Sequence, residues 1–144
     1  MTFDPRTIAT PVYQALQDLR IQHDNNKTRL KAQKSQAVEL YTYLATWGMM
    51  RLKAEEKVLS QDHKEQHQKD VTKQGREDIV KEYFKCLGSS KLANIPELTT
   101  SQGLETIKQL STDEYLGLTG LGLEIAQEFS FWANAIYHDI TGEQ

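Results

Sequence analysis

Two histidines, His63 and His67, form the pair in this sequence whose spacing best suits metal chemistry. Side chains four residues apart share one face of a helix, where two imidazoles can bind one metal ion. The stretch HKEQH does not follow the zinc-protease order, in which Glu comes directly after the first His. The surrounding residues are very polar, so solvated side chains are the simpler interpretation. A small metal-dependent enzyme stays as one hypothesis.

The other residue types that carry catalysis are not arranged for it. Cys86 is the single cysteine, so it cannot form an internal disulfide, and no neighbour that would activate its thiol is evident. The spacing Gly117-x-x-Gly120-x-Gly122 has no strand before it and no Lys after it, so these glycines are better explained by packing between helices. We therefore expect no enzyme: no catalytic residues, no metal and no cofactor.

Basic residues support a more specific hypothesis. Between Arg20 and Lys34 there are five Lys or Arg and a single acid, Asp24. Cations repeated at helical spacing suit the phosphates of a nucleic acid, and no aromatic is interleaved with this first cluster, which favours backbone over base contact. A solvated basic face is the alternative. The predicted RNA-backbone contacts are Arg20, Lys27, Arg29, Lys31, Lys34, Arg51, Lys53 and Lys57.

The distribution of charge agrees with a basic side that meets a partner. Residues 1–91 hold 16 Lys+Arg and 12 Asp+Glu, whereas residues 92–144 hold 1 and 8. Such asymmetry suggests a basic side that meets a partner and an acidic side that does not. The alternative is that charge is unevenly distributed in a small protein without a functional role.

Helical spacing of apolar residues recurs along the chain, and the alternation typical of strands never persists. We predict an all-α fold, a compact bundle of about five or six helices in a single domain that covers residues 1–144. Residues 60–78 are expected to be a solvated helix end or a mobile loop. The expected helices begin at Thr10-Pro11, cover 27–59 with two apolar stripes (one including Trp47 and Met50), cover 77–87 up to Gly88, and close the chain as two helices after residue 100.

The closing helix has the clearest local signal. Ser111 and Glu114 have the spacing of a capping box. Apolar residues then recur at steps of three and four, which predicts a core stripe. Three apolar residues lie off that stripe, and we predict that they form a subunit interface: Leu116, Leu123 and Phe131.

The expected cellular compartment follows from features that the sequence does not show. No apolar run is long enough for a membrane span, and the opening residues MTFDPRTIATPVY do not resemble a signal peptide. With one cysteine, a reducing cytoplasm is the expected location, and no membrane partner is expected.

A family resemblance becomes visible in these helices. The segment LSTDEYLGLTGLGLEIAQEFSFWANAIY resembles the closing helices of the small helical subunit of type III-B (Cmr) CRISPR effector complexes. LYTYLATWGMMRLKAEEK resembles the long helix of that family, and VKEYFKCL its middle helix. The glycine-rich spacing after Tyr115 and the missing Pro before Gly48 depart from the pattern, so a type III-A or III-D small subunit is an alternative. The matching positions in the closing segment are Glu114, Tyr115, Leu118, Thr119, Leu121, Ala126 and Trp132.

The resemblance implies a non-catalytic subunit of an antiviral ribonucleoprotein. Copies would stack as a minor filament along the duplex of guide RNA and target RNA, while other subunits carry nuclease and cyclase activities. Implied partners are guide RNA, target RNA, other CRISPR effector subunits and copies of itself. The competing hypothesis is a helical adaptor that binds a protein partner through apolar helix faces, without RNA.

Overall fold

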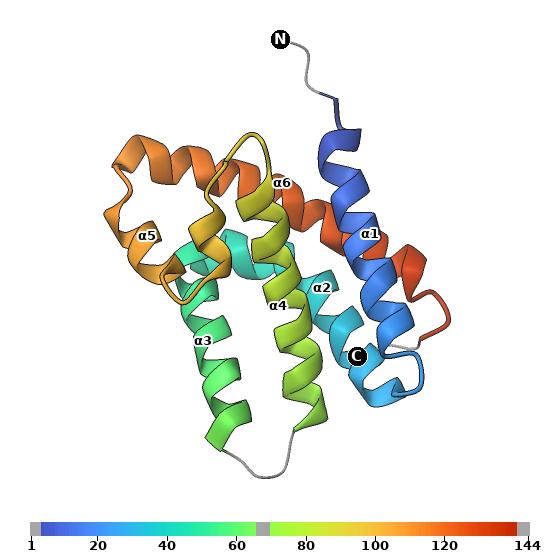
Figure 1. Cartoon of the computed structure of the whole chain (residues 1–144). Coiled ribbons are helices and arrows are strands. Elements are labelled where there is room, and N and C mark those ends of the chain that lie inside the picture. Colours follow the sequence, from blue (N-terminus) through green and yellow to red (C-terminus); the bar gives the residue numbers. More distant parts are fainter. Residues whose placement is uncertain (1–3, 66–69, 141–144) are drawn as a thin grey trace.

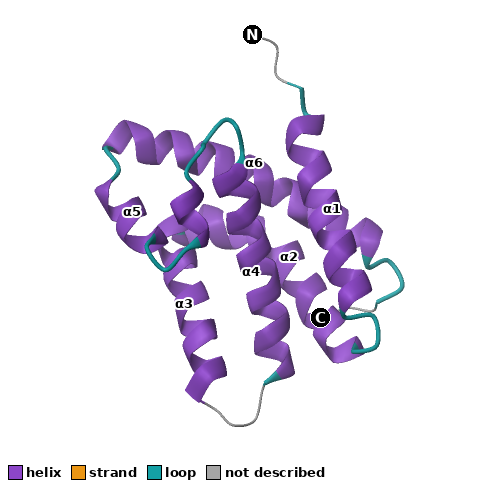
Figure 2. Ribbon diagram, in the orientation of Figure 1, coloured by secondary structure: helices purple, strands orange, loops and turns teal. Residues whose placement is uncertain are grey.

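The computed structural model describes residues 4–65 and 70–140, with the side chains of 61–65 left out, and this part of the chain is helical without a strand. The predicted all-α fold is confirmed (Figure 2). The order of elements is α1 (Arg6–Gln22), α2 (Lys27–Trp47), α3 (Met49–Glu65), α4 (Val71–Ser89), the 3-10 helix η1 (Pro96–Thr99), α5 (Gly103–Gln109) and α6 (Thr112–Ile136).

Helix α2 lies at the centre of the packing, against both α4 and α6. Helix α1 packs on α6, and α3 packs beside α4, while α6 crosses behind them (Figure 1). The interior is filled by large side chains from all of these helices. Those that are fully buried include Leu16, Leu40, Met49, Leu52, Tyr83, Phe84, Phe129 and Tyr137.

The prediction of a single helix over 27–59 is wrong, because the helix is interrupted at Gly48. Gly48 has φ 90°, a left-handed conformation that residues with a Cβ rarely adopt, and it lies between the end of α2 and the start of α3. The Oη of Tyr115 on α6 is 3.5 Å from the amide nitrogen of Met50, which donates to it. The break therefore turns α3 away from α2 at a point that contacts the first turn of α6.

Helix α1 begins earlier than the sequence signals indicate. It starts at Arg6, whose backbone N–H donates to Asp4 Oδ1 at 3.0 Å, and Pro11 lies inside the helix instead of at its first position. Proline inside a helix removes one backbone hydrogen bond and costs stability. Pro11 is exposed, and the helix stays anchored by buried Ile8, Val12, Leu16 and Leu19.

The segment predicted to be solvated or mobile, 60–78, is largely helical. Helix α3 continues to Glu65, and α4 begins at Val71, where Asp70 caps it by accepting from the Thr72 amide at 3.0 Å. Residues 66–69 lie outside the described residues. At its other end α4 passes the predicted stop at Gly88 by one residue.

The capping box of the last helix is confirmed. Ser111 Oγ accepts from the Glu114 amide at 3.1 Å, and Glu114 Oε1 accepts from the Ser111 amide at 2.9 Å. The three glycines that follow differ in role. A Cβ at Gly122 would come within 2.6 Å of Tyr83 Oη, so packing requires this glycine, whereas a Cβ at Gly117 or Gly120 would meet nothing.

Candidate nucleic-acid interface

The eight cations predicted to bind RNA divide into an outward set and an inward set. In the outward set, Lys27, Lys31, Arg51 and Lys57 are exposed on α2 and α3. Within the described part of the chain, Lys27, Lys31 and Lys57 have no hydrogen-bond or ion-pair partner. The inward set consists of Arg20, Arg29, Lys34 and Lys53, and each of these is bound to groups of the same chain.

Arg20 binds the C-terminal end of α6, and Lys34 binds the turn that follows it. Arg20 donates to the Ile136 carbonyl at 2.9 Å and to Asp139 Oδ2 at 2.7 Å, and Lys34 Nζ donates to the Ile140 carbonyl at 2.7 Å. A helix C-terminus has unsatisfied carbonyls and partial negative charge, which cations stabilise. The pKa of Asp139 lies well below its usual value, chiefly because Arg20 hydrogen-bonds its carboxylate.

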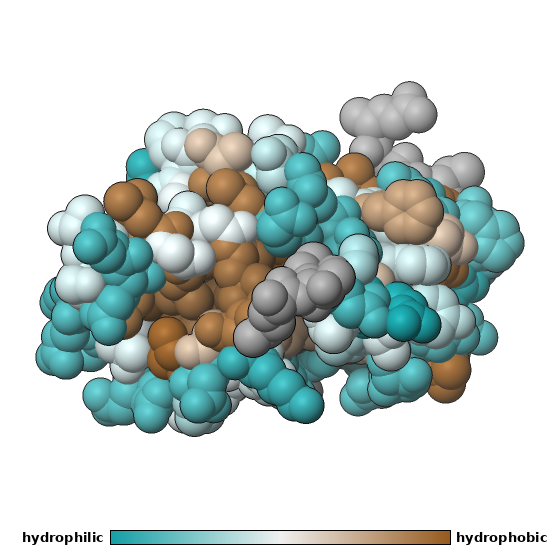
Figure 3. Space-filling model, turned by 90° about the horizontal axis from the view of Figure 1, so that it is seen from above, coloured by the Kyte–Doolittle hydropathy of each residue, from teal (hydrophilic) through white to brown (hydrophobic). Residues whose placement is uncertain are grey.

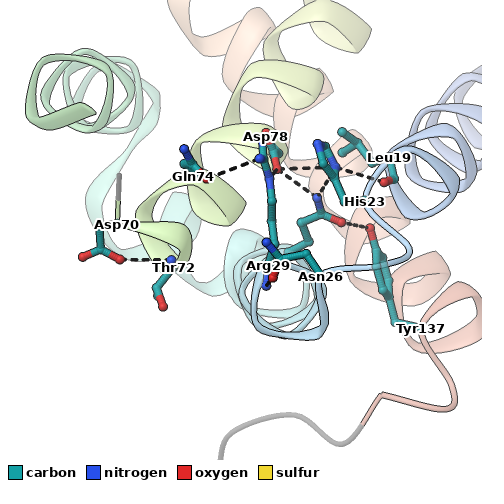
Figure 4. Close-up of polar contacts among 10 residues, drawn as sticks. Leu19, His23, Asn26, Arg29, Asp70, Thr72, Gln74, Asp78 and Tyr137 are labelled. Carbon is teal, nitrogen blue, oxygen red and sulfur yellow. Dashed lines mark hydrogen bonds and ion pairs between the residues drawn. The ribbon is translucent and has the colours of Figure 1, made fainter. Parts of the chain in front are cut away.

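Arg29 belongs to a polar cluster that joins α2, α4 and the end of α6 (Figure 4). Its Nε donates to Asp78 Oδ2 at 2.8 Å and its Nη2 to Asp78 Oδ1 at 2.9 Å, a bidentate pair that raises the pKa of Arg29. Gln33, which is fully buried, donates to the same carboxylate at 2.9 Å and accepts from the Tyr137 hydroxyl at 2.7 Å. The cluster satisfies polar groups that would otherwise be buried without partners.

The close approach of α4 to α2 explains how Arg29 reaches Asp78. A Cβ built on Gly75 would lie 2.6 Å from Ala32 Cβ and 2.7 Å from the Arg29 carbonyl oxygen. No larger residue fits there without moving one helix. Gly75 thus places the first turns of α2 directly on α4, and Arg29 faces α4 as a result.

Lys53 is the most enclosed of the eight cations. Its Nζ donates to Glu56 Oε1 at 2.6 Å and to the Leu98 carbonyl at 2.5 Å, and it lies 4.6 Å from the centroid of the Phe84 ring. Lys53 and Glu56 are both buried. An ammonium held in this way joins α3 to η1 and is unavailable to a phosphate in this conformation.

The exposure of one aromatic residue was not predicted from the sequence. Trp47, expected in an apolar stripe, is 53% exposed, and the guanidinium of Arg51 lies 4.6 Å from its ring centroid. Gly48 is the sequence signal that could have indicated this exposure. A helix that ends there no longer continues the apolar stripe to which Trp47 was assigned. Arg76 on α4 is exposed and has no ion-pair partner among the residues described. Exposed cations thus occur on α4 as well as on α2 and α3, and also at Arg6 on α1 and Lys108 on α5, whereas α6 contains no Lys or Arg.

The three predicted interface residues differ in exposure. Leu116 is 61% exposed and Phe131 is 62% exposed, at opposite ends of α6. Leu123 is half-buried and packs against the core. Phe131 lies edge-on to Trp132, with ring centroids 5.0 Å apart, and Trp132 lies edge-on to Tyr13 of α1 at 5.3 Å. Two of the three residues are therefore on the surface and one is partly in the core.

A separate apolar hollow opens at the end of the molecule where α1 begins and α4 ends. Figure 3 shows this face from above, with apolar side chains gathered to the left of its centre. The hollow has a volume of about 590 Å³, and its apolar lining comes from Ile8, Pro11, Leu92 and Ile125, with Cys86 beside them. Burial raises the pKa of the Cys86 thiol to about 12, so the thiolate needed for nucleophilic attack is scarce.

The metal hypothesis gains no support from the part of the structure that is described. No three His, Cys, Asp or Glu side chains there are grouped to hold an ion. His67 and the side chain of His63 lie outside the described residues. In the same residues, we find no helix with the length and apolar character that crossing a membrane requires.

No protein-family model, no curated protein and no solved structure matches this chain. Inference about function therefore rests on the sequence resemblance and on the placement of charged and apolar side chains. The most informative feature is the separation between exposed cations on α2 and α3 and the acidic α6, which has an exposed apolar side chain near each end.

Proposed function

We propose that this chain is a non-catalytic small subunit of a type III CRISPR RNA-guided effector complex, of the type III-B (Cmr) class. In this proposal, copies stack as a minor filament along the guide RNA–target RNA duplex and contact the RNA backbone in antiviral defence. Support comes from the resemblance of residues 40–57, 80–87 and 110–137, which lie on α2 and α3, on α4 and on α6, and from two unlike surfaces on one small helical body. The observation that carries the proposal is the outward set of cations on α2 and α3.

The outward lysines are suited to phosphate contact because binding RNA would break no bond within the protein. Lys27 and Lys31 lie one helical turn apart on the exposed face of α2, and Arg51 and Lys57 lie on α3. Phosphate contacts fix position without reading sequence, which in an RNA-guided complex is read by base pairing. The inward set has a separate role: it holds the helices that present the outward set.

A single copy is expected to bind RNA weakly. The chain has net charge -3, so only a local basic surface attracts phosphates. Several copies on one RNA present that surface repeatedly, and each bound copy raises the effective concentration of the next contact. The proposed function therefore predicts binding that depends strongly on assembly.

The test is a double substitution, Lys27→Ala with Lys31→Ala, measured as target-RNA capture by the assembled complex over a range of salt concentrations. Losing two phosphate contacts should lower the slope of log affinity against log salt by about 1.5, since each contact contributes roughly 0.7–0.9. Lys34 is left intact, because its bond to the Ile140 carbonyl would mix a structural effect into the result.

The matched control is Lys81→Ala with Lys85→Ala. These exposed lysines on α4 pair with Glu77 and Glu82, so the control removes equal charge from another face. Capture that falls only in the Lys27/Lys31 variant supports the proposal. Equal salt slopes in both variants and in the wild type would contradict it.

A second candidate is the helical adaptor that binds a protein partner without RNA. Exposed Trp47, Leu116 and Phe131 favour it, because large apolar side chains on a surface are typical of protein interfaces. Pull-down with nuclease treatment separates the two: partners that are lost when RNA is digested favour the RNA-guided subunit, and partners that stay favour the adaptor.

A further inference from the structure

Two exposed apolar surfaces of this chain differ in charge. The corner patch consists of Trp47, Met50, Arg51 and Leu116, where α2, α3 and α6 meet. The α6 patch consists of Glu124 and Phe131 on the outer face of α6. The corner patch has three large apolar side chains open to solvent and a cation, whereas the α6 patch has one large apolar side chain and an acid.

The corner patch is held together by contacts within the chain. Arg51 stacks over the Trp47 ring at 4.6 Å, which keeps the indole in place. The Met50 amide donates to the Tyr115 hydroxyl at 3.5 Å, which brings the α3 start beside the α6 turn that carries Leu116. A surface tryptophan fixed by an arginine loses little side-chain freedom on binding and is typical of an interface anchor.

The charges of the two patches are complementary. Among the described side chains of α3, the exposed cations are Arg51 and Lys57 and the exposed acid is Glu55. Helix α6 has four acids and no Lys or Arg. Two of these acids are committed: Glu114 to the capping box and Glu128 to the Trp132 ring N–H at 3.1 Å. Of the two acids that remain, Asp113 lies in the first turn of α6, and Glu124 is exposed between the two ends, where it can face a cation.

The separation of the patches decides the kind of contact. Leu116 and Phe131 are fifteen residues apart on one continuous helix, about 22 Å at 1.5 Å per residue. One copy can therefore use both patches at once. A contact between two different patches is head-to-tail and builds a chain of copies, unlike a two-fold contact that closes at a dimer.

We infer that the corner patch of one copy binds the α6 patch of the next copy, with Trp47 packed near Phe131 and Arg51 paired with Glu124. In this contact Arg51 serves the neighbouring copy, and phosphate contact is left to Lys27, Lys31 and Lys57 of the outward set. This inference rests on the proposed function, because it names the faces through which the small subunits would stack. It concerns protein contact alone, so it can be tested without RNA.

The experiment measures self-association of the full chain by sedimentation velocity over a wide range of concentration. Wild type should form species that grow with concentration. Trp47→Ala and Phe131→Ala should each weaken association by about 30-fold or more, the usual effect of removing an interface anchor. Leu92→Ala is the matched control: Leu92 is 58% exposed but lies outside both patches, so association should not change.

Mixing the two variants gives the sharpest result. The Trp47→Ala copy keeps an intact α6 patch, and the Phe131→Ala copy keeps an intact corner patch. An equimolar mixture should therefore form dimers and stop there. A paired reversal, Arg51→Glu in one copy mixed with Glu124→Lys in another, should restore association that either substitution alone removes.

Several outcomes would overturn the inference. A wild type that stays monomeric at every concentration would do so, as would variants that associate like wild type, or a variant mixture that grows beyond dimers. Capture of another protein by the corner patch of a monomeric chain would point to an adaptor. Failure of the lysine test with intact self-association would instead reject the RNA function and leave the head-to-tail contact standing.

Discussion

The inward and outward cations come from the same stretch of sequence but have opposite surroundings. Arg29, Lys34 and Lys53 donate to carboxylates or carbonyls of the same chain, whereas Lys27 and Lys31 extend into solvent. On α2, Lys31 and Lys34 are three residues apart, and of the two only Lys34 has a partner among the described residues. The comparison teaches that a row of basic residues can contain both structural contacts and a candidate binding surface.

The largest expected effect comes from removing a contact of the inward set. Asp78→Ala removes the acceptor for both Arg29 and Gln33, whose polar groups are largely buried. Removing one member of a buried ion pair leaves the other uncompensated, so we expect the free energy of unfolding to fall by about 3 kcal/mol. Urea unfolding measures this change.

The control for that prediction is Asp18→Ala. Asp18 is an exposed acid on α1 whose carboxylate accepts from Gln14 at 3.0 Å, so its removal should cost less than about 0.5 kcal/mol. Equal losses for the two substitutions would show that the Arg29 cluster does not hold α2 on α4.

An effect of intermediate size concerns the stability of the fold at low pH. The pKa of Asp139 is depressed in the folded chain by Arg20, so its contribution to stability is present above its ordinary pKa of 3.8 and is lost as the pH falls below that value. Asp139→Asn should therefore remove part of the acid destabilisation: thermal melts from pH 5 to low pH should show a shallower fall in Tm than wild type. A parallel fall in both proteins would exclude this role for Arg20 and Asp139.

Local and repetitive features of the fold could be predicted from the sequence. Helical periodicity gave the all-α fold, and Ser111 with Glu114 gave the start of α6, because both depend on neighbouring residues. The break at Gly48 could not be placed, since a glycine inside a helical pattern is also compatible with a kink or close packing. The start at Arg6 was missed because Pro11 is a stronger signal than Asp4.

The candidate site was harder to predict because exposure is a property of the whole fold. Nothing within the α2 sequence shows that α4 covers Arg29 and leaves Lys31 open. That outcome depends on Gly75, which is 46 positions further along the chain than Arg29. In the same way, Asp139 and the carbonyls that bind Arg20 and Lys34 come from the last described turn of the chain.

The smallest expected effect compares Lys31 and Lys34 directly. Lys34→Ala removes the bond to the Ile140 carbonyl and should lower the free energy of unfolding by about 1 kcal/mol, because that carbonyl is partly buried and loses its donor. Lys31→Ala removes a solvated side chain and should change stability by less than about 0.5 kcal/mol. Urea unfolding of both single variants gives the two values.

Since both substitutions introduce alanine on α2 and remove one charge, helix propensity and net charge cancel, and the difference isolates the inward contact. Equal values for the two lysines would mean that the inward and outward positions on α2 are equivalent in solution, and the choice of Lys27 and Lys31 as the RNA-facing pair would lose its basis.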